Sequence, residues 1–96
     1  MKGYVIANVH VSDPAGYEAY RSQTAAIIAQ YGGRFLVRGG AVEVREGEPD
    51  IGRLAVLEFE SVEAARIFYD SPGYQAIVPA RQANSDSSLF IVEGAT

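Results

Sequence analysis

A small set of polar side chains carries the candidate chemistry of this 96-residue chain: Asn8, His10, Arg38, Glu58 and Tyr74. Asn8 and His10 are two residues apart in an apolar run, so in a strand they share one face. His10 is the only histidine, and together with Glu58 it is a candidate for acid-base catalysis. Arg38 can bind a carboxylate through its forked guanidinium. Asn8 and Tyr74 are candidates for further ligand contacts.

Each of these residues also has a structural explanation. A lone histidine at a strand end is more often a hydrogen-bonded surface or interface group than a catalyst. Arg38 and Glu58 can form an ion pair that orients two subunits, instead of an anion anchor beside a carboxylate base. The Gly39-Gly40 pair would let a ligand approach the backbone, but a β-bulge also needs glycine.

The composition argues against several classes of site and partner. Without cysteine, the chain has no disulfide, thiolate nucleophile or sulfur-bound metal, and one histidine cannot make a multi-histidine metal site. The net charge is −4 and the basic residues are scattered, which disfavours nucleic acid and anionic membranes. No apolar run approaches 18 residues, and the segment Met1-Lys2-Gly3-Tyr4 lacks the apolar core of a signal peptide. We therefore expect a cytoplasmic protein with no cofactor, nucleic-acid partner or membrane partner.

Local signals predict the elements that position these side chains. Apolar alternation predicts strands over residues 3–11, 34–38, 41–46, 53–60 and 88–93. Asp13-Pro14 predicts a helix that runs to about Tyr31, and Ser61 predicts a second helix. Ser71-Pro72 predicts a third helix, which Pro79 should end or kink, followed by a polar connector over residues 82–87.

This order predicts one α+β domain over residues 1–96, a ferredoxin-like βαββαβ sandwich with helices on one face of an antiparallel sheet. The strand alternation assigns one apolar sheet face to the helices. Its members are Val5, Ala7, Val9, Phe35, Val37, Ala55, Leu57 and Phe59. The opposite face would carry Tyr4, Ile6, Asn8, His10, Leu36, Arg38, Leu54, Val56 and Glu58.

The second face is too apolar to be left in water. It therefore predicts a homodimer with two-fold symmetry that packs through this face. Buried polar groups on it would have to pair, with Arg38 bonded to Glu58 or to a ligand carboxylate. We accordingly expect a small-molecule pocket between the sheet and the partner subunit.

The chain resembles the DUF1330 family. The resemblance rests on the segments YVIANV from Tyr4, YGGRFLVRGG from Tyr31 and YDSPGYQ from Tyr69, together with Asp13-Pro14 and Arg81. It implies a ferredoxin-like subunit of the dimeric α/β-barrel superfamily, and no particular reaction. That superfamily includes cofactor-free quinol-type monooxygenases, haem-degrading enzymes, and decarboxylase- or dehalogenase-like proteins. Asn8 matches a first-strand asparagine of some of its oxygenases, but their tryptophan is absent, which argues against haem degradation.

Two functions remain open on the sequence. The first is a homodimer that binds a small acidic or aromatic metabolite and acts, in one version, as a cofactor-free enzyme. Arg38 would then anchor the ligand, while Glu58, His10 or Asn8 handles or orients a proton. The second is a non-catalytic dimer whose sheet faces are filled by their own side chains. An open cavity beside Arg38 favours the first function, and Arg38 fully paired to Glu58 favours the second.

Overall fold

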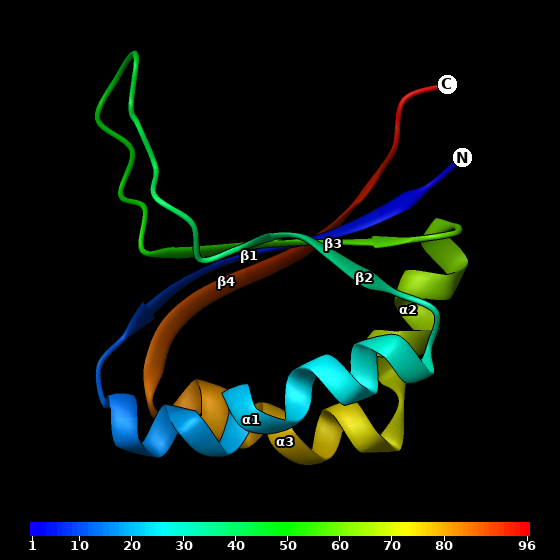
Figure 1. Ribbon diagram of the computed structural model, residues 1–96, viewed down its shortest axis with the longest axis horizontal. Helices are drawn as coiled ribbons and strands as arrows, with labels where there is room; N and C mark the ends of the chain where they lie inside the picture. Colours follow the sequence, from blue (N-terminus) through cyan, green and yellow to red (C-terminus); the bar gives the residue numbers. More distant parts are fainter.

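A four-stranded sheet carries helices on one face only (Figure 1). The computed structural model describes residues 1–96. The strand order is β2-β3-β1-β4, and every neighbouring pair is antiparallel. This arrangement confirms the predicted ferredoxin-like α+β fold. The elements are β1 (Gly3–Val11), α1 (Pro14–Gln30), β2 (Arg34–Arg38), β3 (Arg53–Phe59), α2 (Val62–Asp70), α3 (Pro72–Ala83) and β4 (Ser85–Glu93).

The predicted caps begin all three helices. Asp13 accepts a hydrogen bond from the Gly16 amide at 3.3 Å, and Ser61 accepts one from Ala64 at 3.0 Å. Ser71 accepts one from Tyr74 at 3.2 Å, and it also ends α2. These side chains satisfy amides that the first helical turn leaves without an acceptor. None of the helices has the length and apolar content that crossing a membrane requires.

The core lies between the sheet and the helices. Its most buried large side chains are Val5, Ile28, Phe59, Phe68 and Tyr74. The Phe68 ring lies 5.0 Å from Phe59 and 4.5 Å from Tyr74, centroid to centroid. This aromatic cluster fixes α2 and α3 against the end of β3, because aromatic pairs add to the free energy of burial.

Three predicted boundaries are wrong. Residues 41–46 form no strand, because no strand of the chain lies beside the 39–52 loop to pair with it. Of the two alternatives given for Pro79, an end of the helix is wrong: α3 continues past Pro79 to Ala83, since Val78 and Arg81 are buried and their packing compensates for the missing amide. The predicted connector over residues 82–87 is also absent, because β1 is long enough to pair with Ser85 and Ser87 of β4.

A β-bulge in β2 changes which residues face the helices. Phe35 lies opposite Leu57, but the register then shifts by one residue, so Val37 lies opposite Val56 and Arg38 opposite Ala55. A one-residue shift moves every later side chain to the other face of the sheet. The prediction that Val37 faces the helices and Arg38 the open face is therefore wrong, and the two residues exchange places.

Candidate functional site

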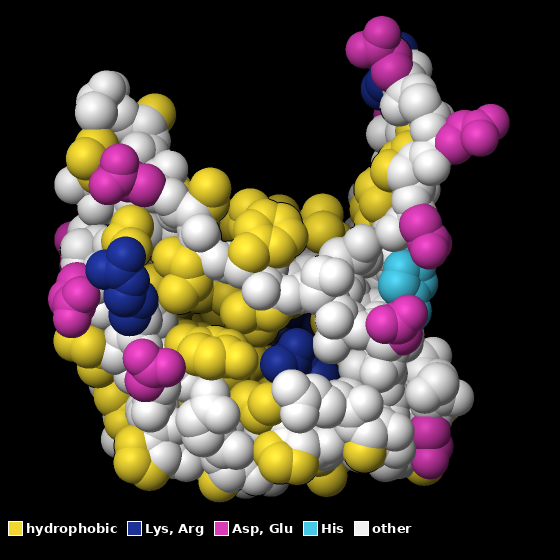
Figure 2. All heavy atoms as spheres, turned by 180° about the vertical axis from the view of Figure 1, so that it is seen from behind, with side chains coloured by type: hydrophobic (Ala, Val, Ile, Leu, Met, Phe, Trp, Pro, Cys, Tyr) yellow, Lys and Arg dark blue, Asp and Glu magenta, His cyan; other side chains and the backbone are white.

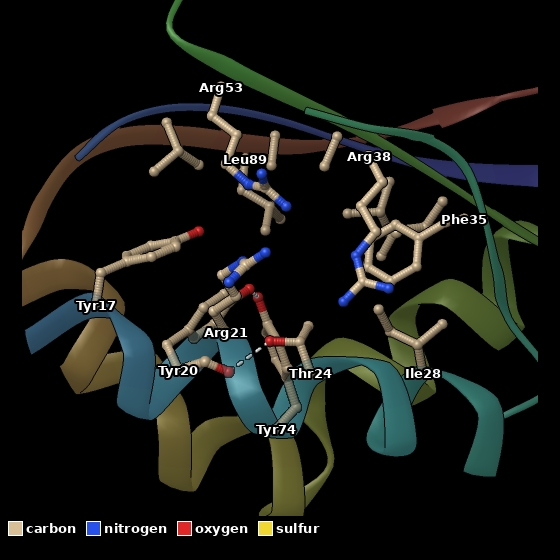
Figure 3. A pocket seen from close by; sticks show the side chains of 15 residues that line it. Tyr17, Tyr20, Arg21, Thr24, Ile28, Phe35, Arg38, Arg53, Tyr74 and Leu89 are labelled. Carbon is tan, nitrogen blue, oxygen red and sulfur yellow. Dashed lines mark hydrogen bonds between the residues drawn. The ribbon is translucent and has the colours of Figure 1, made fainter. Parts of the chain in front are cut away.

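A cavity of about 40 Å³ lies between the sheet and the helices (Figure 3). Its volume exceeds what one water molecule needs, which is roughly 10–15 Å³ by a similar measure. Hydrophobic residues dominate its wall, as in most small-molecule sites. The lining residues are Val5, Ala7, Val9, Tyr17, Tyr20, Arg21, Thr24, Ile28, Phe35, Arg38, Arg53, Ala55, Leu57, Tyr74 and Leu89.

Three arginines from three different elements line this cavity, and no carboxylate does. Arg21 comes from α1, Arg38 from the end of β2 and Arg53 from the start of β3. In Figure 3 the side chains of Arg21 and Arg53 point toward one another from opposite walls, and Arg38 reaches down beside Phe35. Arg38 and Arg53 form no ion pair, and Arg21 forms one with Glu18, at 3.4 Å on the exposed side of α1. The charged side chains that line the cavity are therefore all positive.

The bulge and the following glycine hold two of these arginines in place. The Arg38 guanidinium lies 4.5 Å from the Phe35 ring centroid, which is a cation–π contact. Gly39 has φ +67°, and a Cβ at this position would collide with the Arg53 guanidinium. Gly39 is thus required by its backbone conformation, and a Cβ there would displace the end of the flexible Arg53 side chain.

Phenols form the base of the cavity. The hydroxyls of Tyr20 and Tyr74 are hydrogen-bonded at 2.7 Å, and Thr24 donates to the Tyr20 carbonyl at 2.6 Å. Burial raises the pKa of the Tyr17, Tyr20 and Tyr74 phenols above the ordinary value of 10.0. The phenols are therefore neutral near pH 7, and they serve as hydrogen-bond donors or acceptors rather than as bases.

A fourth arginine lies close to the phenol pair. Arg81 of α3 is only 4% exposed, and its guanidinium carbon is 5.8 Å from the Tyr20 ring centroid. Its Nη1 donates to the Ser87 hydroxyl at 3.0 Å, while its buried Nε has no hydrogen-bond partner. A buried cation without a carboxylate adds to the positive potential at this end of the core.

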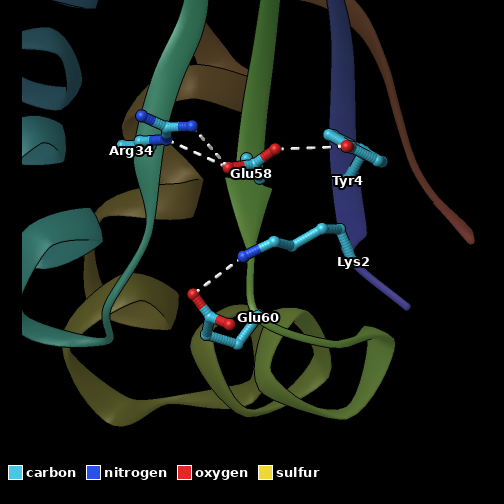
Figure 4. Close-up of polar contacts among 5 residues, drawn as sticks. All are labelled: Lys2, Tyr4, Arg34, Glu58 and Glu60. Atoms are coloured by element: carbon cyan, nitrogen blue, oxygen red, sulfur yellow. Dashed lines mark hydrogen bonds and ion pairs between the residues drawn. The ribbon is translucent and has the colours of Figure 1, made fainter. Parts of the chain in front are cut away.

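Glu58 does not lie near the cavity. It lies on the open face, where Arg34 bonds it at 2.9 Å and the Tyr4 hydroxyl at 3.1 Å (Figure 4). The hydrogen bond from Arg34 is the main reason that the pKa of Glu58 is lowered. The predicted pairing of Glu58 with Arg38 is therefore wrong. A neighbouring ion pair, Lys2 with Glu60 at 2.9 Å, is exposed.

Asn8 and His10 share the open face, as predicted, but they contact the chain rather than a cavity. Asn8 donates to the Asp50 carbonyl at 3.0 Å and accepts from the Gly52 amide at 2.8 Å. The His10 Nε2 lies 3.3 Å from the same carbonyl and 3.5 Å from the Asp50 carboxylate. Because Glu58 pairs with Tyr4, six residues from His10 along β1, about 20 Å separates the two proposed acid-base groups.

Of the residues singled out in the sequence, the structure thus brings only Arg38 and Tyr74 to the cavity. Arg21 and Arg53 were missed, although both have a sequence signal. Arg53 is separated from Ala55 and Leu57 by two and four residues along β3, so its side chain lies on the same face of the strand as theirs. Arg21 follows Tyr17 by one helical turn, on the side that faces the core. No three His, Cys, Asp or Glu side chains lie close enough together to hold a metal ion.

Comparison with known proteins identifies the family and the fold. RPA0582 of Rhodopseudomonas palustris, a protein of unknown function, is 21% identical, with a TM-score of 0.76 over 99% of this chain and 83% of that chain. SnoaB of Streptomyces nogalater, a cofactor-independent oxygenase, is 22% identical, with a TM-score of 0.63 over 99% and 94%.

A third solved structure is a dimeric protein of unknown function with a ferredoxin-like fold from Bacteroides fragilis. It is 11% identical, with a TM-score of 0.62 over 97% and 96% of the two chains. No curated protein matches the chain. The model of the domain of unknown function DUF1330 matches residues 2–95, and the chain therefore belongs to the DUF1330 family.

Proposed function

We propose that this protein binds a small acidic or aromatic metabolite in the cavity between its sheet and its helices. The observation that carries the proposal is the convergence of Arg21, Arg38 and Arg53 on a largely apolar cavity that has no carboxylate in its wall. An anionic group on the ligand would supply the missing counter-charge. The rest of the ligand would contact the aromatic and aliphatic wall.

The physical reason is the sign of the charges around the cavity. Arg21 and Arg38 are exposed and Arg53 is half-buried, so an anion that enters from solvent can reach all three guanidiniums. Arg38 lies over the Phe35 ring, and neither Arg38 nor Arg53 forms an ion pair with a carboxylate of the chain. A carboxylate or phenolate of a ligand can bond two such guanidiniums at once. The neutral phenols of Tyr20 and Tyr74 then add hydrogen bonds rather than repulsion.

The proposed site differs from the one expected on the sequence, which lay between the sheet and a partner subunit. The proposed cavity lies instead between the sheet and the helices of the chain. Arg38 and Tyr74 keep the ligand-binding role that the sequence suggested for them. Asn8, His10 and Glu58 lie on the open face, so the proposal gives them no contact with the ligand.

For a reaction, we propose oxygenation without a cofactor as the class to test. It is supported by the likeness to SnoaB, a cofactor-independent oxygenase. The cavity wall contains no histidine or carboxylate, so its residues would act by stabilising an anionic form of the substrate and not by removing a proton. The alternative is the non-catalytic dimer. The open cavity beside Arg38 and the absence of an Arg38–Glu58 pair favour ligand binding over that alternative.

Calorimetric titration with benzoate tests the proposal, with benzyl alcohol as the uncharged control ligand. Benzoate should bind, and benzyl alcohol should bind at least tenfold more weakly, because a charged hydrogen bond contributes roughly 1.5–3 kcal/mol. The substitutions Arg53→Gln and Arg38→Gln should each weaken benzoate by about tenfold or more. Arg66→Gln, an exposed arginine of α2, is the matched control and should change the affinity less than about twofold.

Two results would count against this function. Benzoate and benzyl alcohol binding equally well would show that the arginines recognise no anion. Absence of binding by salicylate, phenylacetate and benzoate alike, in a folded dimer, would support the non-catalytic alternative. Where an aromatic acid does bind, oxygen uptake with a dihydroxynaphthoate separates a binding protein from an oxygenase.

We also propose that the protein is a homodimer that packs through the open sheet face. Seven of the nine exposed large hydrophobic side chains lie on β2, β4 or the loop that joins β2 to β3. The likeness to a dimeric ferredoxin-like protein supports the same assembly. The seven are Leu36, Val37, Val42, Val44, Ile51, Phe90 and Val92.

A further inference from the structure

Residues 39–52 form a long arm that rises from the sheet on the side away from α1 and α3 (Figure 1). The Gly39 amide donates to the Leu54 carbonyl at 2.8 Å, and the Asn8 side chain is hydrogen-bonded to the backbone of Asp50 and Gly52. Both ends of the arm are therefore fixed. Residues 40–51 make no backbone–backbone hydrogen bond. An ordered segment of this length without internal pairing is unusual in a compact subunit.

The sequence of the arm is nevertheless that of a strand. Val42 and Val44 alternate with Glu43 and Arg45, the pattern of a half-buried strand. In the subunit, Val42 is 45% exposed and Val44 is 49% exposed. The pattern thus predicts a buried face and a pairing partner that the subunit itself does not provide.

The overall dimensions show that the arm is extended and not folded back. The accessible surface is 5846 Å², whereas a compact monomer of 10.3 kDa has about 5,350 Å². The radius of gyration is 13.4 Å, compared with about 12.5 Å for a compact chain of this length. Figure 2 shows a notch between the arm and the chain ends, with hydrophobic atoms on its floor and on the inner edge of the arm.

The two free edges of the sheet are not equivalent. The edge strand β2 has five residues and a bulge, and a bulge hinders the addition of another strand. The other edge strand, β4, has nine residues in regular register with β1. Phe90 and Val92 of β4 are 51% and 45% exposed on the open face. A long regular edge beside exposed apolar side chains is a template for an added strand.

We propose that, in the homodimer, the arm of each subunit lies across the other subunit and residues 41–46 pair as a strand with the free edge of its β4. Val42 and Val44 would then cover the exposed apolar side chains of the partner's open face. A second copy fits this role because the chain carries both halves of the contact, the unpaired strand and the unpaired edge, on one side of the molecule. A two-fold axis then makes both contacts at once.

This inference rests on the dimer that is part of the proposed function, so the experiment separates the two. Analytical ultracentrifugation gives the dimer dissociation constant of the wild type and three variants. Val42→Ser with Val44→Ser should raise that constant at least about tenfold, because apolar contacts are lost. The control variant, Glu43→Ser with Arg45→Ser, also changes two residues, but on the other side of the strand, and it leaves the net charge unchanged. It should change the dissociation constant by less than about threefold. Phe90→Ser removes an apolar side chain of the open sheet face and should also raise the dissociation constant, whether or not the arm contributes.

The outcomes are distinct. A monomeric wild type at micromolar concentration overturns both the dimer and the arm contact. If Phe90→Ser weakens the dimer but the double valine variant does not, the dimer packs through the sheet face and the arm has no role in it.

Hydrogen exchange supplies a second readout that does not depend on affinity. The amides of residues 42–45 have no backbone acceptor in the subunit, so they should exchange fast in a monomer. Slow exchange of alternate amides in the dimer, abolished by Val44→Pro, is expected from strand pairing. Fast exchange of all four amides in a protein that is fully dimeric refutes the pairing.

Discussion

At the scale of single residues, the phenol pair at the base of the cavity connects stability with the site. Tyr20 and Tyr74 satisfy each other's hydroxyls at 2.7 Å in a buried place. Tyr20→Phe should lower the free energy of unfolding by about 1–3 kcal/mol, because the Tyr74 hydroxyl is left buried without its partner. Urea denaturation measures the change. Tyr31→Phe, whose hydroxyl makes no hydrogen bond within the chain, should be close to neutral, and an equal loss in both variants would contradict this explanation.

A second residue-scale prediction concerns acid stability. The pKa of Glu58 is lowered in the folded protein, mainly by Arg34. Because the pKa of Glu58 in the folded protein lies below its ordinary value of 4.5, the ionised carboxylate stabilises the fold at pH values above 4.5. This stabilisation is lost as the pH falls through the pKa of the folded protein. Glu58→Gln should therefore be less stable than the wild type at pH 7, and the difference should shrink below pH 4.5.

Thermal unfolding from pH 7 down to pH 3 follows that difference. Glu60→Gln, which removes the exposed partner of Lys2, is the control and should show a smaller difference, since exposed ion pairs contribute little. A gap between Glu58→Gln and the wild type that stays constant with pH would show that packing, and not charge, is responsible.

At the scale of elements, the junction of β2 with the arm decides where two cavity arginines lie. Gly39→Ala should cost about 1 kcal/mol or more, because alanine is strained at φ +67° and its Cβ meets the Arg53 guanidinium. Benzoate affinity should fall with it, since Arg53 must move. Gly40→Ala is the matched control, because nothing lies within 4 Å of a Cβ there. Denaturation and calorimetry of the two variants should separate clearly, and equal behaviour would contradict the proposed role of Gly39.

The same junction explains what could be predicted from the sequence. Helix starts at Asp13, Ser61 and Ser71 depend on contacts within one turn, so they were predictable. The bulge at β2 depends on the pairing of two strands that lie far apart in the sequence, and simple alternation therefore placed Arg38 on the wrong face. Arg53 follows strict alternation and could have been assigned to the helix side.

At the scale of the whole molecule, the charges are unevenly distributed. The net charge is −4, yet the cavity wall holds only positive ionisable side chains besides its tyrosines. Acidic residues gather on the arm and on the open face, as in Glu43, Asp50 and Glu58. A pocket of the opposite sign inside an acidic protein favours anions locally. The affinity for benzoate should accordingly decrease as salt is added, although the protein as a whole is acidic.

The arm has one further consequence, because it leaves the sheet at Arg38 and returns at Arg53. An anion that bridges those two side chains ties together the two ends of the segment that would reach the second subunit. Ligand and partner would then be thermodynamically linked, and the linkage is reciprocal. If dimerisation raises the affinity for the ligand by some factor, saturation with the ligand must raise the affinity of the two subunits for each other by the same factor. The ligand affinity of this single-domain chain would then depend on whether the protein is a monomer or a dimer, without any movement of domains.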